Sequence, residues 1–197
     1  MRYKPGRREE TRTKMLSAAG RGFRSHGYAG IGVDGLAKQA GVTSGAFYSH
    51  FGSKDAAFRA ALAAGLDEVA GSLPVFQRDH GSRWVEAFVD YYLGNEHRDD
   101  LAGGCAMATL TPEVVRTQPD VQAAFEEKMT RIAEIVAAGL EGGGVKDRHA
   151  RAWAMLSILI GALTLARAMN GEATATAIAE AAKAAALQAA GPVRAYV

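Results

Sequence analysis

The chain has 197 residues, of which 48% are hydrophobic and 22% charged, a composition that is typical of folded soluble proteins and excludes a largely disordered chain. Its single cysteine, Cys105, excludes an internal disulfide framework and fits a reducing cytoplasm. The residue spacings typical of protein metal sites do not occur, so we expect no metal ion and no cofactor.

Charge is distributed unevenly along the chain, although the net charge is only +2. Residues 1–54 carry ten lysines and arginines and three acidic residues, a net charge of +7, and the rest of the chain has a net charge of −5. A basic first part indicates a polyanionic partner for that part alone. A solvated charged tail is the alternative explanation for charges so near the N-terminus.

The first predicted helix runs from about Glu9 to His26, where apolar residues recur every three or four positions, and ends at Gly27. A short second helix ends at Gly41, and Thr43 or Ser44 can cap a third. Two short helices joined by a tight turn that contains glycine form a helix-turn-helix.

The third predicted helix has an apolar side and a polar side. Phe47 and Phe51 are expected to pack inward, on Leu36 and on Phe23 of the first helix. The outward side then presents hydrogen-bond donors without an acidic residue among them, which suits phosphate oxygens and the edges of bases. These outward residues are Thr43, Ser44, Gly45, Tyr48, Ser49, His50 and Lys54.

Ser53 is placed to cap the next helix, which is expected to continue to about Ser72 and to be broken by Pro74. Ser82 can cap a further helix that is apolar on more than one face. Residues 94–104 are expected to form a polar loop.

A break near Gln118–Pro119 precedes a long amphipathic helix that extends to about Leu140. Residues 141–147 are expected to be a hinge-like linker. Two helices rich in small residues, about Asp147–Met169 and Ala173–Ala190, close the chain, so the predicted fold is all-α.

The most apolar run, Ala152–Ala166, has 15 residues and is shorter than the roughly 20 that a membrane helix needs. The charged N-terminus lacks the apolar segment of a secretory signal. We therefore expect a cytoplasmic protein with no membrane association.

The stretch from Phe23 to Phe58 resembles the DNA-binding signature of the TetR family of bacterial transcriptional regulators. The matching residues are Phe23, Gly27–Tyr28, Val33, Leu36–Ala37, Ala40–Gly41–Val42, Gly45, Phe47–Tyr48, His50–Phe51 and Ser53–Lys54. One departure is Gly32, which stands where the family usually has Thr or Ser and brings no hydroxyl for a phosphate. A second is Gly35, which lowers the helix propensity of the second helix by about 1 kcal/mol relative to Ala.

The resemblance implies an all-helical homodimer. Residues 1–54 would form the helix-turn-helix domain, and residues 55–197 would bind an inducer and supply the dimer interface. Tyr48 and Lys54 match family positions that usually contact DNA phosphates. The full set of candidate DNA-binding residues is Arg7, Arg8, Gly32, Thr43, Ser44, Gly45, Tyr48, Ser49, His50 and Lys54.

The resemblance also assigns the last two helices to a four-helix dimer interface, for which Leu159 and Leu163 are the expected contacts. Packing within one subunit is the alternative. Aromatic residues and methionines of the larger domain suit a cavity for a small apolar or aromatic molecule, although such residues are also ordinary core residues. The candidate ligand-binding residues are Trp84, Phe88, Tyr91, Tyr92, Cys105, Met107, Phe125, Met129 and Trp153.

Cys105 follows Gly103 and Gly104 at the start of a predicted helix. A thiol near a helix N-terminus has a lowered pKa and is more reactive. Some members of the family sense electrophiles or oxidants through a cysteine in a similar context. The alternative is a small buried hydrophobic residue.

An all-helical enzyme is the remaining class to consider. None of the five histidines is accompanied by a serine or cysteine motif that would form a nucleophile and base pair, and Asp99–Asp100 lies in a polar segment. The resemblance therefore implies a ligand-responsive repressor that binds a palindromic double-stranded operator as a homodimer and is released by a small effector. A thiol-based repressor acting through Cys105 is the alternative within the same class.

Overall fold

The computed structural model describes the backbone of residues 5–191 and the side chains of residues 9–191. Within this range the secondary structure is helical throughout, as predicted, and no strand occurs. The elements are α1 (Pro5–Gly30), α2 (Val33–Gln39), α3 (Ser44–Phe51), α4 (Lys54–His80), the 3-10 turn η1 (Gly81–Arg83), α5 (Trp84–Leu93), α6 (Asn95–Asp99), α7 (Ala106–Val114), α8 (Pro119–Gly139), α9 (Val145–Ala168) and α10 (Glu172–Ala190).

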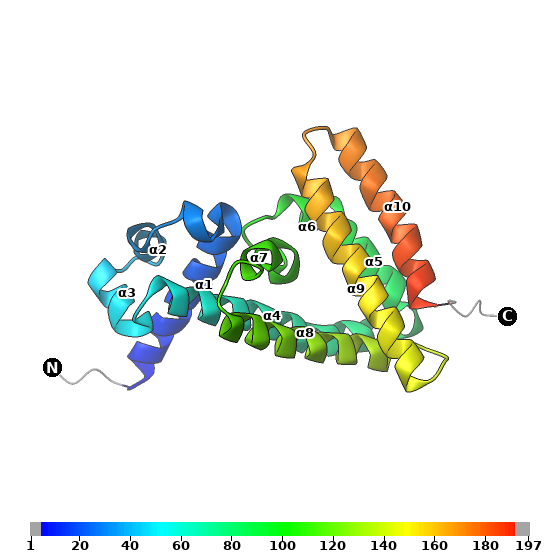
Figure 1. Cartoon of the computed structure of the whole chain (residues 1–197), viewed down its shortest axis with the longest axis horizontal. Helices are drawn as coiled ribbons and strands as arrows, with labels where there is room; N and C mark the ends of the chain where they lie inside the picture. Colours follow the sequence, from blue (N-terminus) through cyan, green and yellow to red (C-terminus); the bar gives the residue numbers. More distant parts are fainter. Residues whose placement is uncertain (1–4, 192–197) are drawn as a thin grey trace.

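The helices form two groups, which we call the head (α1–α3) and the body (α4–α10). Figure 1 shows the head at one end of the molecule and the pair α9 and α10 at the other, with α4 and α8 running side by side between them. Helix α7 lies between the head and α9. Both α4 and α7 contact α1, so the head meets the body at two places.

The head is built around fully buried apolar side chains. Phe23, Leu36 and Phe47 are completely buried, and Phe58 from the start of α4 packs edge-on against Phe23 at a ring distance of 5.2 Å. Phe47 and Phe51 lie against each other with ring centres 4.9 Å apart. The predicted inward orientation of the third helix is therefore confirmed.

Local capping places the helices of the head as predicted. The Thr43 hydroxyl accepts a hydrogen bond from the Ala46 amide at 3.2 Å, and the Ser53 hydroxyl accepts one from the Ala56 amide at 3.0 Å. Such caps satisfy amide groups that have no partner within the helix. The regular helical backbone of α1 is interrupted at Gly27, where φ is 71°, as predicted, and a further helical turn beyond this kink extends α1 to Gly30.

The prediction that Pro74 breaks the fourth helix was wrong, because α4 continues through it to His80. The proline is exposed, and the turns before it bury Leu66, Ala70 and Leu73 in the core. Near its end, Gln77 donates to the carbonyl of Ile135 in α8 at 3.0 Å. Packing on α8 thus offsets the one helical hydrogen bond that proline removes.

Two predictions about the following segment were also wrong. Ser82 lies inside η1, and α5 has no side-chain cap. The segment expected to be a polar loop contains α6, in which His97 and Arg98 are buried. Arg98 is paired with Glu172 of α10 at 2.7 Å, so its charge is neutralised by a residue far away in the sequence.

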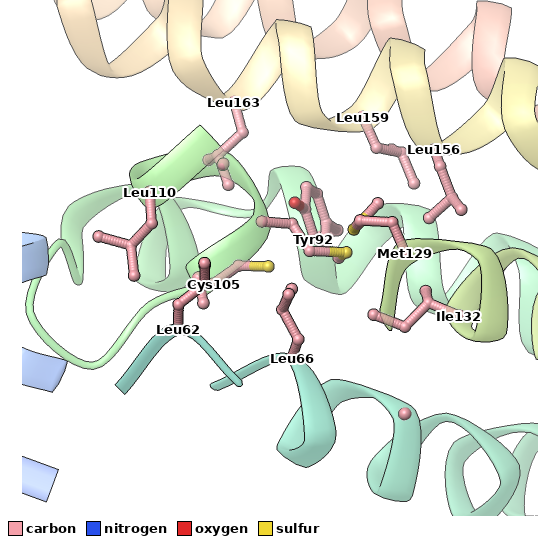
Figure 2. Packing of buried hydrophobic residues seen from close by; sticks show 14 of the residues in the cluster. Leu62, Leu66, Tyr92, Cys105, Leu110, Met129, Ile132, Leu156, Leu159 and Leu163 are labelled. Atoms are coloured by element: carbon pink, nitrogen blue, oxygen red, sulfur yellow. The ribbon is translucent and has the colours of Figure 1, made fainter. Parts of the chain in front are cut away.

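Helix α9 has 24 residues and is long and apolar enough, by length and composition alone, to cross a membrane. Its apolar side is nonetheless part of the body, because Leu156, Leu159 and Leu163 are buried against the other helices (Figure 2). This is the alternative that the sequence left open for this helix, packing within one subunit. We therefore assign α9 as a core helix of a folded domain.

Candidate DNA-binding surface and interior cavity

The turn between α2 and α3 fixes the geometry of the helix-turn-helix. Gly41 has a φ of 68°, a left-handed conformation that glycine adopts without strain. Its amide donates to the carbonyl of Lys38, and the amide of Val42 donates to that of Ala37. The turn therefore ends α2 and starts α3 within a few residues.

The outward side of α3 presents most of the residues that sequence analysis assigned to it. Thr43, Gly45, Tyr48 and Ser49 are exposed, and the Tyr48 side chain is 50% accessible. His50 and Lys54 are half-buried, Gly32 is exposed, and the side chains of Arg7 and Arg8 lie outside the described residues. This side remains a candidate surface for DNA.

One acidic residue modifies this surface in a way that the sequence did not predict. The Ser44 hydroxyl donates to the carboxylate of Asp34 in α2 at 2.5 Å. This hydroxyl is therefore already engaged. Tyr48 and Ser49 on the exposed side are better placed than Ser44 to donate to a phosphate.

Lys54, the first residue of α4, is held next to the head by an aromatic ring. Its ammonium nitrogen lies 4.4 Å from the centre of the Tyr28 ring, within the range of a cation–π interaction. The Tyr28 hydroxyl donates to the carboxylate of Asp55. This hydrogen bond, with burial and the negative charge as smaller causes, raises the pKa of Tyr28 to about 12.

A cavity of about 130 Å³ lies in the body next to α1, with Arg24 as its lining residue from the head. Its wall comes from α1, α4, α5 and α6, from the residues before α7 and from the start of α7. Five candidate ligand-binding residues line it, namely Phe88, Tyr91, Tyr92, Cys105 and Met107. The lining residues that sequence reasoning missed are Arg24, Gly65, Glu68, Val69, Ser72, His97, Gly103, Gly104 and Ala106.

The other four candidates do not line this cavity. The Trp84 indole donates to the carbonyl of Gly139 at 2.9 Å and joins α5 to the end of α8. Met129 is buried in the core, as Figure 2 shows, and Phe125 is half-buried on the same helix. Trp153 is 39% exposed on α9. These four residues are therefore not supported as ligand contacts at this cavity.

Tyr92 lines the cavity, and its hydroxyl is buried behind the cavity surface, next to the Cys105 thiol. The hydroxyl has no hydrogen-bond partner of good geometry among the described residues. Burial, together with the nearby Cys105 thiol, raises the pKa of Tyr92 well above 10, so the hydroxyl keeps its proton. A buried donor without a partner is costly to a protein, and a ligand acceptor would satisfy it.

His97 and Cys105 complete the polar part of the wall. The Nδ1 atom of His97 lies 2.7 Å from the carbonyl of Tyr92 and must carry the proton, because a carbonyl only accepts. Burial lowers the pKa of His97, so the ring is neutral near pH 7. The part of the wall that His97 forms is thus uncharged.

The pKa of Cys105 differs from the sequence-based expectation. The residue does stand at the N-terminal cap of α7, and its thiol is favoured toward ionisation by Tyr92 and by the amides of Met107 and Ala108. Burial is the larger effect and raises the pKa above its ordinary value. Desolvation of the thiolate outweighs the helix contribution, which agrees with the small buried residue that the sequence also allowed and not with a thiol of lowered pKa.

The chain has a basic helix-turn-helix head, one long connecting helix and a helical body with a cavity. This architecture is that of a bacterial transcriptional regulator that binds DNA with its head. Residues 15–61 match the family described as "Bacterial regulatory proteins, tetR family", and residues 83–186 match the "Transcriptional regulator LmrA/YxaF-like, C-terminal domain". The chain belongs to the TetR family, whose members are transcriptional regulators and not enzymes.

One known repressor has a similar sequence, and solved structures have a similar fold. The chain is 27% identical over 139 residues to the HTH-type transcriptional repressor SCO4008 of Streptomyces coelicolor, covering 71% of this chain and 69% of that protein. The fold is similar to that of a TetR regulator from Chloroflexus aurantiacus (TM-score 0.77, 23% identity, 96% and 99% of the two chains). It is also similar to Escherichia coli NemR in its reduced form (TM-score 0.76, 20% identity, 91% and 96%).

Proposed function

We propose that this transcriptional regulator is a ligand-responsive repressor. As a homodimer it binds a two-fold symmetric operator through α3, and it leaves the operator when a small molecule occupies the cavity. The observation that carries the proposal is the position of the cavity, whose wall includes Arg24 from the head and Tyr92 and Cys105 from the body. A ligand there touches both parts of the molecule at once.

The chemistry of the cavity wall indicates the class of effector. Phe88, Tyr91 and Met107 offer apolar and aromatic contact. The buried Tyr92 hydroxyl offers one hydrogen bond to an acceptor. The effector is therefore a small, mainly apolar or aromatic molecule that carries a carbonyl or another neutral acceptor.

The exposed side of α9 supports the proposed dimer. Trp153 and Leu165 are 39% and 56% exposed, and Gly161 between them has open space where a side chain would stand. Small residues allow close approach of helices, and a two-fold interface repeats the same surface on both subunits. Leu159 and Leu163, the contacts expected from sequence, are completely buried within one subunit and cannot form this interface.

Thiol sensing through Cys105 is the second candidate, because the thiol lines the cavity and lies next to Tyr92. An electrophile that enters the cavity would reach the sulfur. The raised pKa makes this reaction slow at neutral pH, so the alternative requires an electrophile that binds in the cavity before it reacts. A Cys105→Ser variant that still responds to the effector excludes this route.

The test of the proposed function is direct binding to DNA. Fluorescence anisotropy of a labelled duplex from the promoter region of the protein's own gene should show saturable binding that weakens steeply with salt. A scrambled duplex of the same length and composition is the control. Binding that is equal for both duplexes, or that does not change with salt, would contradict a sequence-specific repressor.

A further inference from the structure

The cavity and the head are joined by a short piece of chain, residues 97–105, which we call the wall segment. On the head side, the Nε atom of Arg24 in α1 donates to the carbonyl of Ala102 at 2.6 Å. These two residues are 78 positions apart in the sequence. The guanidinium is half-buried, so this hydrogen bond is shielded from water and stronger than a surface contact.

On the body side, a second arginine holds the same segment. Arg167 of α9 donates through Nη2 to the carbonyls of His97 and Asp100, at 2.7 and 3.1 Å, and through Nε to that of Arg98 at 3.0 Å. The wall segment is therefore fixed between one guanidinium from the head and one from the body. Movement of its backbone on one side changes the hydrogen bonds on the other.

The wall segment is also a face of the cavity, because His97, Gly103, Gly104 and Cys105 line it. Its packing is tight. A side-chain carbon at Gly104 would lie 2.2 Å from the carbonyl oxygen of Asp100 and 2.5 Å from Arg167. The backbone at Gly104 therefore has no free space around it. A ligand that is larger than the cavity must displace the whole wall segment and cannot displace one residue of it alone.

Helix α7, which directly follows the wall segment, makes a second contact with the same part of α1. A side-chain carbon at Gly27, the kink of α1, would lie 2.8 Å from a carboxylate oxygen of Glu113. The last two turns of α1 thus contact the wall segment through Arg24 and α7 through Gly27. Helix α4 is the covalent connection between head and body and packs on α1, and these contacts add a second attachment of α1 to the body.

We propose that the wall segment is the connection through which an occupied cavity changes the position of the DNA-binding head, and that the Arg24–Ala102 hydrogen bond is its critical contact. The proposal rests on the proposed function and specifies the regulation of the same site. With the cavity empty, the bond holds the head in the orientation that binds the operator. A ligand that displaces the wall segment lengthens or breaks the bond, and the two heads of a dimer lose the spacing that the operator requires.

The chain contains its own reporter of this movement. Cys105 is the only cysteine in the sequence and lies at the end of the wall segment, buried in the structure. Iodoacetamide alkylates a thiolate with loss of iodide, and only when the sulfur is accessible. The rate of alkylation therefore measures how often the wall segment opens.

The first experiment compares Arg24→Gln with Arg21→Gln. Both changes remove one positive charge from α1, but Arg21 is exposed and donates to Ser17 on its own helix. Arg24→Gln should raise the alkylation rate of Cys105 about tenfold and weaken duplex binding about tenfold beyond the effect of Arg21→Gln, with circular dichroism showing both variants folded. Equal alkylation rates and equal affinities in the two folded variants would overturn the proposal.

The second experiment needs no variant and so does not depend on the folding of one. If opening of the wall segment weakens DNA binding, bound DNA must make opening rarer by the same factor. A saturating amount of the promoter duplex should therefore slow alkylation of the wild-type protein by that factor. An alkylation rate that is the same with and without bound duplex overturns the proposal. Failure of the duplex to bind at all refutes the proposed function instead, and the Arg24 alkylation result then still decides whether the wall segment is fixed by the head.

Discussion

The ammonium group of Lys54 lies over the ring of Tyr28, and the hydroxyl of the same ring donates to Asp55. One tyrosine near the end of α1 thus contacts a cation and an anion in the first turn of α4. The pair fixes the start of the helix that connects head and body. It also orients Lys54 on the side of the molecule where phosphates are expected.

Tyr28→Phe should lower the free energy of unfolding by about 1 kcal/mol near pH 7, because it removes a partly exposed hydrogen bond to a carboxylate and keeps the ring. The folded-state pKa of Tyr28 is raised to about 12, from an ordinary value of 10. The contribution is therefore fully present below pH 10 and is lost as the pH rises through 12. Urea unfolding of both proteins across this range measures it. Equal stability at pH 7 would show that the bond contributes nothing.

Tyr48→Phe and Lys54→Ala should each weaken binding to the promoter duplex by about 1 kcal/mol without loss of fold, because both side chains are available to phosphates. For Lys54→Ala, the slope of log affinity against log salt should also decrease by about 1. Anisotropy titrations at several salt concentrations give both quantities.

Phe47→Ala is the contrasting variant, since loss of a fully buried ring should destabilise the head by about 3–5 kcal/mol. A double Tyr48 and Lys54 variant with wild-type affinity would remove these residues from the interface.

Replacement of Leu165 by Glu should convert the proposed dimer into folded monomers, because the side chain is exposed in the single subunit. Replacement of Leu159 by Glu should instead unfold the body, since it places a charge in the core. Sedimentation velocity reports the oligomeric state, and circular dichroism reports folding. A Leu165→Glu protein that remains dimeric would place the interface on another surface.

Alkylation of Cys105 by iodoacetamide at pH 7 should be much slower in the folded than in the unfolded protein, because burial shields the sulfur and raises the pKa of the thiol. Mass spectrometry of the intact protein over time gives both rates. Unfolded protein in urea is the control and should follow the ordinary thiol pKa. A fast reaction of the folded protein at pH 7 would instead support the sensor with a lowered pKa that the sequence suggested.

The local features of the head could be predicted from the sequence because each depends on neighbouring residues. The left-handed turn at Gly41 and the caps at Thr43 and Ser53 are examples. Pro74 was misjudged because packing of α4 on α8 is not visible in the residues around it. Whether a helix continues through a proline depends on contacts with residues that are distant in the sequence, and the residues around the proline do not reveal those contacts.

The residues of the cavity could be predicted from the sequence only in part, for the same reason. Aromatic residues near Tyr92 were expected to form a cavity and do so, but Arg24 and His97 were missed because their partners lie elsewhere in the fold or on the backbone. Helix α9 is apolar on nearly every side, so periodicity could not tell which side faces inward. The assignment of Leu159 to the dimer interface came from the family resemblance, and the residue is completely buried within one subunit.

Release of the operator by an occupied cavity can be tested in one titration. Neutral aromatic carbonyl compounds are first selected as those that raise the melting temperature of the wild-type protein but not that of Ser72→Trp, in which a large ring obstructs the cavity. The dissociation constant of the labelled promoter duplex is then measured with and without each compound. We predict an increase of about 100-fold, which corresponds to roughly 2.7 kcal/mol of coupling. Compounds that saturate the cavity and leave the dissociation constant unchanged would contradict the account.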